Sequence, residues 1–248
     1  MEPIRSTRNP AVVEAGRLHR AGERRRQRRT LLEGPHLLDE ALAAGVTIHR
    51  TFCLGDDPGM PRWPAVSLVD EIVLAKLAGT DSPRGPVAVI DIPSSVPLPD
   101  DRSVLALWDV SDPGNVGTIL RSAAAFGLGV AVGPGTADPW APKVLRAGAG
   151  AHFRTPLSVL GSIDDLDRHR LAATVVAGGV DPIDIGPGQW VVLIGSEAHG
   201  LSPDSIAAAA IRISIPMPGG TESLNAAVAA SIVAYGLSIG AKRRLPHR

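Results

Sequence analysis

The sequence of 248 residues contains a single cysteine, Cys53. One thiol excludes a framework of disulfides within the chain and any zinc site that needs several cysteines. No apolar run of 18 residues is free of charges or helix breakers, and the first residues lack the apolar segment of a signal peptide. We therefore expect a cytoplasmic protein that has no metal site and does not insert into a membrane.

A net charge is also missing, because 25 basic and 25 acidic side chains cancel. Their distribution along the chain is uneven, however. Residues 1–30 contain nine arginines and three glutamates, a net charge of +6, and the remaining residues carry −6. This contrast indicates that the N-terminal end contacts a polyanion, whereas the zero sum by itself says little about a partner.

The pattern of apolar residues indicates two domains. Residues 9–30 predict one arginine-rich helix, and the alternation that follows predicts a small α/β unit. Three prolines between Ile92 and Asp101 predict a linker. The chain is therefore expected to form an N-terminal domain over residues 1–92, a linker over 93–102 and a second domain over 103–248.

The second domain alternates between short apolar strands and helices. This order predicts an α/β fold with a mainly parallel sheet that helices cover on both faces. Its strands are expected at residues 104–110, 129–132, 171–177, 190–194 and 211–215. Its helices are expected at residues 115–126, 143–149, 203–210 and 223–241. In the first domain, strands are expected at 48–54, 66–69 and 87–92 and a helix at 70–77.

Three segments of the second domain place glycine, proline and polar residues directly after a strand. In open α/β sheets, ligands bind at the carboxyl ends of the strands. The first segment contains Asn115 and Arg121, six residues apart. If Asn115 caps the helix, Arg121 projects near it about one and a half turns later. The alternative is that Asn115 is only a helix cap and Arg121 only a surface ion-pair partner.

The second segment, Gly195-Ser196-Glu197-Ala198-His199-Gly200, follows a fully apolar strand. Gly195 allows a ligand to approach the backbone closely, and Glu197 is able to accept hydrogen bonds or orient an arginine. A tight turn with a solvated glutamate is the alternative. The third segment is a Gly/Pro-rich loop before the last helix, which Thr221 or Ser223 is expected to cap. Free N–H groups of that loop suit the polar atoms of a ligand.

The order and spacing of the three segments are more specific than any one of them. Asn-x-Gly-x-x-x-Arg, then Gly-x-Glu-x-x-Gly, then Ile-Pro-Met-x-Gly-x-x-Glu-Ser-Leu-Asn closely resemble the motifs of the SpoU/TrmH family of RNA ribose 2′-O-methyltransferases, in the SPOUT superfamily. This match covers residues 104–241. In the first domain, residues 32–42 resemble the helix entry of the small, ribosomal-protein-like RNA-binding domain that many members carry.

The resemblance implies transfer of a methyl group from S-adenosylmethionine to a ribose 2′-hydroxyl. It also implies a deep trefoil knot over roughly residues 190–235 and a homodimer with the site near the subunit interface. The cofactor is then expected among the loops of the second and third motifs, where it would be lined by Gly195, Ser196, Gly200, Ile215, Met217 and Leu224.

By the same resemblance, Arg121 is the central catalytic candidate. A guanidinium stays protonated near neutral pH. We therefore expect Arg121 to bind the adjacent phosphate and to stabilise the forming alkoxide, rather than to act as a base. The residues expected to position Arg121 and the ribose are Asn115, Glu197, Ser223 and Asn225. Contacts to RNA phosphates are expected from Arg17, Arg20, Arg24, Arg25, Arg28 and Arg29.

The favoured substrate is RNA of the large ribosomal subunit, 23S rRNA. A separate ribosomal-protein-like N-terminal domain is more typical of family members that act on ribosomal RNA. A tRNA methyltransferase of the same family and a non-catalytic RNA-binding protein on the same scaffold are the alternatives. A dinucleotide-binding enzyme is disfavoured, because Gly148-Ala149-Gly150 lacks the third glycine of that fingerprint and does not directly follow a strand.

Overall fold

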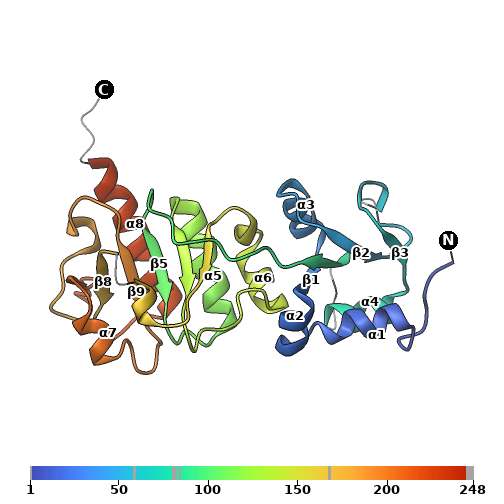
Figure 1. The fold of residues 1–248 in the computed structure, drawn as a ribbon, viewed down its shortest axis with the longest axis horizontal. Coiled ribbons are helices and arrows are strands. Elements are labelled where there is room, and N and C mark those ends of the chain that lie inside the picture. Colours follow the sequence, from blue (N-terminus) through green and yellow to red (C-terminus); the bar gives the residue numbers. More distant parts are fainter. Residues whose placement is uncertain (1, 58–59, 80–82, 84, 167–168, 244–248) are drawn as a thin grey trace. The chain divides into compact units, whose positions relative to one another are not determined.

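The computed structural model describes residues 2–57, 60–79, 83, 85–166 and 169–243. It divides into two compact units, which are drawn in Figure 1. One unit is Met1–Ser94 with Trp140–Phe153, and the other is Ser95–Pro139 with Arg154–Arg248. No helix in the described part of the chain combines the length and the apolar character that a membrane crossing requires.

The segment Trp140–Phe153 groups with the first unit, although the sequence places it inside the range predicted for the second domain. Thr30 Oγ1 donates a hydrogen bond to the carbonyl of Trp140 at 2.7 Å. Arg146 forms an ion pair with Glu33 at 2.9 Å. Contacts of this kind join segments more than a hundred residues apart, and local sequence patterns carry no sign of them.

A four-stranded sheet forms the centre of the first unit. Its strands are β1 (Arg29–Glu33), β2 (Ile48–Cys53), β3 (Val66–Leu68) and β4 (Val87–Asp91), in the order β1-β4-β2-β3. Strand β4 is antiparallel to β1 and β2, and β3 is parallel to β2. The α-helices that follow β1 in this unit are α3 (Pro35–Ala43), α4 (Glu71–Ala78) and α6 (Pro142–Gly148). Short 3₁₀ turns cover Met60–Arg62 and Ala151–Phe153. The strands and the helix predicted here are confirmed.

The predicted single helix over residues 9–30 is wrong, because the structure has two short helices there. They are α1 (Pro10–Arg17) and α2 (Ala21–Gln27). Nη1 of the buried Arg24 donates to the carbonyls of Leu18 and His19, at 2.9 Å in both cases. This side chain satisfies carbonyl groups that the end of a helix leaves without partners. The break between α1 and α2 is therefore stabilised by a charge-assisted contact from within the same segment.

The second unit contains a six-stranded sheet in which every pairing is parallel, which confirms the predicted α/β class. In spatial order the strands are β10 (Ile211–Ile213), β8 (Leu171–Thr174), β9 (Val191–Ile194), β5 (Val104–Leu107), β6 (Gly129–Val132) and β7 (Leu157–Val159). All residues of β5, β6 and β9 are buried, as expected for strands covered on both faces. Strand β7 is absent from the sequence prediction.

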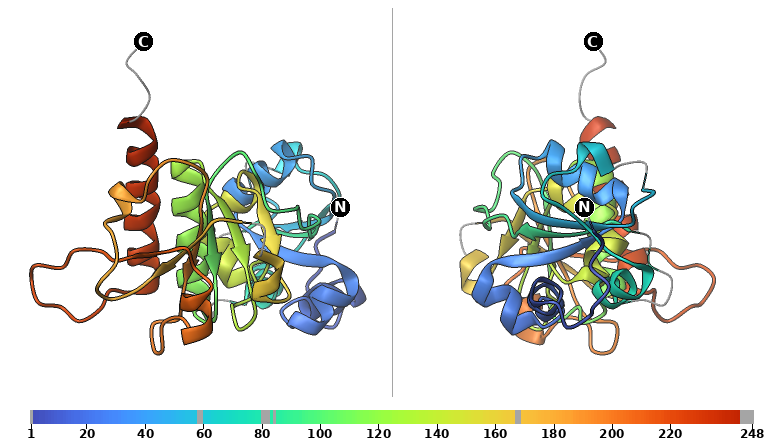
Figure 2. Two further views of the ribbon diagram at one scale, coloured as in Figure 1. Left: turned by 60° about the vertical axis from the view of Figure 1, so that its left-hand side comes forward. Right: turned by 90° about the vertical axis from the view of Figure 1, so that its right-hand side faces the viewer.

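The principal helices of the second unit are α5 (Pro113–Phe126), α7 (Pro203–Ala207) and α8 (Ala226–Arg243), with 3₁₀ turns at Ile163–Leu166 and Pro182–Asp184. Helices α5 and α8 pack side by side, as Figure 2 shows. Ser122 and Ser231 share a hydrogen bond of 2.7 Å across this contact. Phe126 and Tyr235 meet edge to face, with ring centroids 5.8 Å apart. The first and last helices of the unit are thereby brought together.

Candidate active site

A cavity of about 460 Å³ lies where β8, β9 and β10 end. The loops that surround it are those of the second and third motifs. All six residues predicted to hold a cofactor line the cavity: Gly195, Ser196, Gly200, Ile215, Met217 and Leu224. Glu197 and Ser223, which were predicted to position the reacting groups, line it as well. Tertiary structure thus gathers two motifs that are about twenty residues apart in the chain around one space.

The loop after β9 folds back closely on itself. A Cβ atom added at Gly195 would lie 2.4 Å from the carbonyl carbon of Gly200 and 2.6 Å from the nitrogen of Leu201. The main-chain N–H of Gly200 donates to the carbonyl of Ser196 at 2.9 Å. No side chain fits at Gly195 without moving the backbone, so the glycine is required for the shape of this loop.

The end of β8 forms another part of the wall, which sequence reasoning missed. Thr174, Val175 and Val176 line the cavity. Thr174 Oγ1 donates to the carbonyl of Leu193 at 2.8 Å, which ties the end of β8 to β9. Ligands bind at the carboxyl ends of parallel strands, and this rule applies to β8 as it does to β9. The sequence does not reveal, however, that β8 and β9 are neighbours in the sheet. His199, for which the sequence indicates no function, also lines the cavity.

Hydrogen bonds between side chains join the three motifs. Asn225 Nδ2 donates to Asn115 Oδ1 at 3.1 Å, and Asn115 Nδ2 donates to a carboxylate oxygen of Glu197. Asn225 Oδ1 accepts from the main-chain N–H groups of Ala227 at 2.9 Å and Val228 at 3.2 Å. Because each amide donates on one side and accepts on the other, the chain of contacts sets the orientation of both asparagines.

Two predicted helix caps are therefore wrong. Asp112, rather than Asn115, caps α5, since its carboxylate accepts from the N–H of Asn115 at 2.8 Å. Asn225 fills this role for α8 in place of Thr221 or Ser223. The side chain of an N-cap residue accepts a hydrogen bond from an N–H group in the first turn of its own helix. With Asp112 as the cap, the amide of Asn115 is left to contact Glu197.

Arg121 does not join this network in the structure. Its side chain is exposed and forms no hydrogen bond or ion pair within the residues that the structure describes. Six residues of α-helix correspond to a rotation of about 600°, so Asn115 and Arg121 lie on different faces of α5. The residue after Arg121 is Ser122, whose hydroxyl shares a hydrogen bond with Ser231 of α8.

The comparison with protein families identifies the family that carries these motifs. Residues 102–235 match the model of the SpoU rRNA Methylase family. The chain belongs to this family. Residues 9–88 match a second model, the MRM3-like substrate binding domain. As a member of the SpoU family, the protein is an RNA methyltransferase that uses S-adenosylmethionine.

Relatives similar over nearly their whole length support this membership. An uncharacterized tRNA/rRNA methyltransferase of Synechocystis is 37% identical over 94% of this chain and 92% of its own. The 23S rRNA (guanosine(2553)-2′-O)-methyltransferase RlmP of Bacillus subtilis is 30% identical over 96% of this chain and 99% of its own. Among solved structures, an rRNA methyltransferase of Sinorhizobium meliloti with bound AdoMet aligns with a TM-score of 0.86 and 28% identity, covering 99% of both chains.

The residues of the SpoU cavity fit S-adenosylmethionine. The side chains of Ile213, Leu224 and Val233 provide apolar walls of the kind that an adenine ring requires. The tight loop from Gly195 to Gly200 presents main-chain groups to the polar atoms of a ligand. Within the described residues, His, Cys, Asp and Glu side chains form no group of three or more that suits a metal ion.

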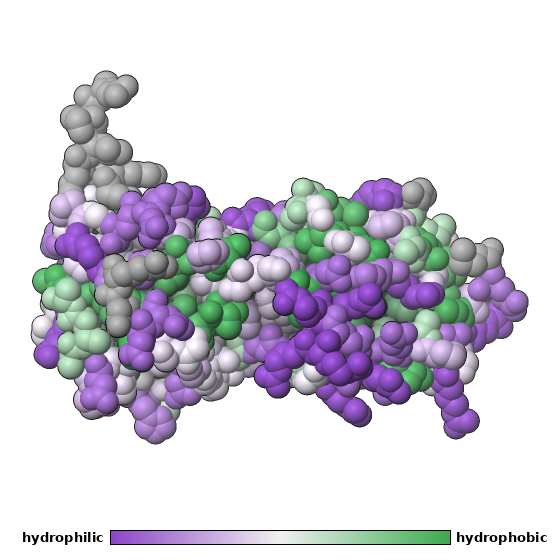
Figure 3. Space-filling model, in the orientation of Figure 1, coloured by the Kyte–Doolittle hydropathy of each residue, from purple (hydrophilic) through white to green (hydrophobic). Residues whose placement is uncertain are grey.

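The predicted RNA-binding arginines divide into two groups. Arg17, Arg20, Arg25 and Arg28 are exposed, and Arg29 is half-buried with its Nε 3.6 Å from Asp91. Figure 3 shows strongly hydrophilic side chains gathered over α1 and α2. Arg24 is the exception, because its side chain is only 3% exposed and caps α1. The prediction that Arg24 contacts RNA is corrected, since a buried guanidinium bound to carbonyls is not available to a phosphate.

Proposed function

We propose that this SpoU-family enzyme methylates a ribose 2′-hydroxyl of 23S rRNA in the cytoplasm. One observation carries the proposal, namely that Asn115 links the first motif to Glu197 at the edge of the cofactor-sized cavity. The relatives favour this substrate over tRNA. RlmP of Bacillus subtilis and a 23S rRNA (uridine(2479)-2′-O)-methyltransferase of Streptomyces viridochromogenes are both named for ribose methylation of 23S rRNA.

The enzyme has to weaken the hold of the ribose oxygen on its proton and to aim that oxygen correctly. S-adenosylmethionine, when bound, supplies an electrophilic methyl group. Glu197, Asn115 and Asn225 form a rigid chain of hydrogen bonds that positions the ribose at the rim of the cavity. Arg121 is the cation of the site. It binds the phosphate next to the target and stabilises the negative charge that develops on the ribose oxygen.

The working form is a homodimer. Val228, Ile232 and Tyr235 form an apolar stripe on α8, and they are 48%, 38% and 50% exposed. Their spacing of four and three residues places them on one face of the helix. Arg121 on α5 is exposed, and it has no partner within the described residues. A second copy of the chain covers the stripe and supplies the hydrogen-bond or ion-pair partners that Arg121 lacks in the single chain.

The C-terminal part of the second unit forms a trefoil knot over roughly residues 190–235. One close backbone contact supports this proposal. A Cβ added at Gly179 would lie 2.5 Å from the carbonyl carbon of Ile213. Glycine at such positions lets one part of the chain pass tightly against another. The domain assignment also stays a proposal, with RNA bound by residues 1–92 and catalysis performed by 103–248.

Mapping of 2′-O-methyl groups in RNA tests this function. RNA from a strain that lacks the gene is compared with RNA from its parent and from a strain that expresses the Arg121→Ala variant. We expect one 23S rRNA nucleotide to lose its 2′-O-methyl group in both mutant strains. Loss of a methyl group from tRNA alone would show that the substrate assignment is wrong. Unchanged RNA, together with a purified protein that does not bind S-adenosylmethionine, would refute the enzymatic function.

A further inference from the structure

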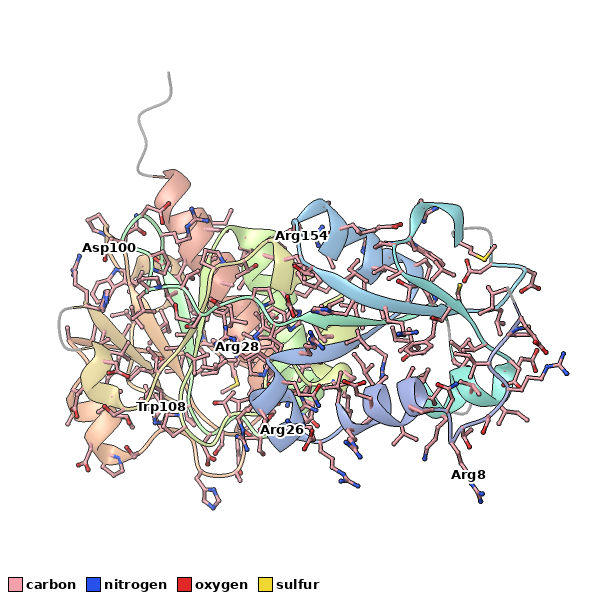
Figure 4. The ribbon with its side chains drawn as sticks, turned by 45° about the vertical axis from the view of Figure 1, so that its right-hand side comes forward. Arg8, Arg26, Arg28, Asp100, Trp108 and Arg154 are labelled. Carbon is pink, nitrogen blue, oxygen red and sulfur yellow. The ribbon has the colours of Figure 1, made fainter. Side chains whose placement is uncertain are left out.

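A groove lies between α1 and α2, away from the motifs that form the active site. It encloses about 470 Å³. One wall is a single face of α1, with Val13, Glu14 and Arg17. The other wall is the end of α2, with Arg26 and Gln27, and Arg8 also lines the groove. Arg8 and Arg26 are labelled in Figure 4 and lie on the same side of the unit.

The groove has more positive than negative side chains. Three guanidinium groups line it, together with the carboxylate of Glu14, and the carboxylate of Glu23 lies beside Arg26 and Gln27. Arg26 forms an ion pair with Glu23 at 2.7 Å, and its hydrogen bond lowers the pKa of the Glu23 carboxyl. Arg8 and Arg17 form no ion pair with any carboxylate that the structure describes. Two guanidinium groups are therefore available to an anion, and Arg26 is held in place beside them.

Gln27 has a defined orientation in this groove. Its Nε2 donates to Oε2 of Glu23 at 2.9 Å. An ionised carboxylate only accepts hydrogen bonds, so the amide has to present its NH₂ group to Glu23. The carbonyl oxygen Oε1 of Gln27 is left as an acceptor for a ligand. Glu14 provides a second acceptor, and both acceptors suit an N–H donor rather than another anion.

The remaining surface is apolar. Val13 is 41% exposed between Glu14 and the arginine side chains. An exposed branched aliphatic side chain offers a flat contact to the face of a planar ring. The groove thus combines cations, hydrogen-bond acceptors and an apolar patch, which are the complements of a phosphate, an exocyclic amino group and a base. The carboxylates of an acidic peptide complement only the cations and leave the acceptor atoms of Glu14 and Gln27 without donors.

We propose that the α1–α2 groove binds a short unpaired segment of the RNA substrate and selects bases that carry an exocyclic amino group. Arg8 and Arg17 contact the phosphates, and Gln27 Oε1 with Glu14 accepts from the amino group. Adenine, cytosine and guanine have such a group, whose two N–H bonds suit two acceptors, whereas uracil has a single N3–H that lies between two carbonyl oxygens. This inference rests on the proposed function, because that function makes RNA the substrate.

Fluorescence anisotropy of the full-length protein with labelled oligo(A), oligo(C) and oligo(U) tests the groove. We expect oligo(A) and oligo(C) to bind about three- to tenfold more tightly than oligo(U), which corresponds to one hydrogen bond. Gln27→Met is expected to remove this preference without changing the salt dependence. Arg17→Gln is expected to weaken binding of all three and to lower the slope of log Kd against log salt by about 0.7. Arg62→Gln, at a surface ion pair with Asp39 in the same unit, is the matched control and should match wild type.

Equal affinity for the three oligonucleotides, or a preference that survives in Gln27→Met, would overturn the proposal. Wild-type RNA binding by Arg17→Gln, with loss of binding to poly-glutamate, would identify a protein-binding groove instead. Methyl transfer to 23S rRNA is measured with the same samples. If wild type methylates RNA but lacks the base preference, only the groove assignment fails. If it binds the oligonucleotides with the expected preference but methylates no RNA, only the enzymatic function fails.

Discussion

Asn115 donates its side-chain N–H to the carboxylate of Glu197, a residue 82 positions later in the chain. Asn115 lies in the first turn of α5, which follows β5, and Glu197 lies in the loop after β9. Strands β5 and β9 are neighbours in the sheet, so their carboxyl ends bring the two side chains together. Asn225 extends the contact to the third motif. The motifs of the SpoU family thus meet through side chains, in addition to enclosing a common cavity.

Replacement of Asn115 by aspartate tests this contact. The new carboxylate faces Glu197, and two neighbouring carboxylates raise the pKa of one of them. We expect kcat to fall about 10- to 100-fold at pH 8, because the ribose is no longer positioned correctly. Part of the activity should return as the pH falls towards 6 and one carboxyl group binds a proton. Ala43→Asp adds the same charge at an exposed position of α3 in the first unit and should leave the pH profile unchanged.

Replacement of Arg121 by alanine tests the role of the cation. We expect kcat to fall about 10²- to 10³-fold, the usual effect of losing a group that stabilises a developing oxyanion. Affinity for S-adenosylmethionine, measured by calorimetry, should not change, because Arg121 does not line the cavity. Arg121→Lys keeps the charge but loses the planar fork and should retain intermediate activity. Full activity of the alanine variant would exclude Arg121 from catalysis.

Replacement of Gly195 by alanine tests the shape of the cofactor loop. The added methyl group would meet the backbone of Gly200 at 2.4 Å, so the loop has to move. We expect the free energy of unfolding to fall by about 1–3 kcal/mol, as in other overpacked sites. Binding of S-adenosylmethionine should be lost in calorimetry. Gly55→Ala is the control, since no atom lies within 4 Å of a Cβ added there.

Arg24 and Arg25 are neighbours in sequence with opposite expected roles. Arg24→Ala removes a buried guanidinium that caps α1 and should destabilise the fold by about 1.5–3 kcal/mol in urea unfolding. Arg25→Ala should leave the unfolding curve unchanged and weaken RNA binding at low salt, because its side chain is exposed. Equal stability losses in both variants would contradict the separation of structural and RNA-binding arginines.

The pair of Asp39 and Arg62 gives a prediction about pH. Hydrogen bonds from the Arg62 guanidinium lower the pKa of the Asp39 carboxyl below its ordinary value of 3.8. A depressed acid contributes stability above its unfolded pKa and loses it as the pH falls through the folded value. NMR titration should show the Asp39 pKa below 3.8 in wild type and closer to it in Arg62→Gln. The difference in Tm between the two proteins should therefore be present at pH 7 and shrink below about pH 4.

Several features followed from local patterns in the sequence. Apolar runs such as Val191–Ile194 predicted buried parallel strands, because only strands covered on both faces are apolar throughout. The resemblance of the second and third motifs to those of the SpoU family predicted that Gly195, Ile215 and Leu224 hold the cofactor, and all three line the cavity. The N-terminal arginines predicted a positive surface, and most of them are exposed.

Other features were decided only by the tertiary structure. Arg24 is chemically identical to Arg25, and burial alone makes it a helix cap instead of an RNA contact. Asn115 contacts Glu197 because Asp112 already caps α5. Trp140–Phe153 joins the first unit through contacts with β1 that span more than a hundred residues. The sequence by itself determined most of the strands, the motifs and the family, because these depend on near neighbours in the chain. Which side chains are buried, and which meet across the fold, depends on the packing of segments that are far apart in the sequence.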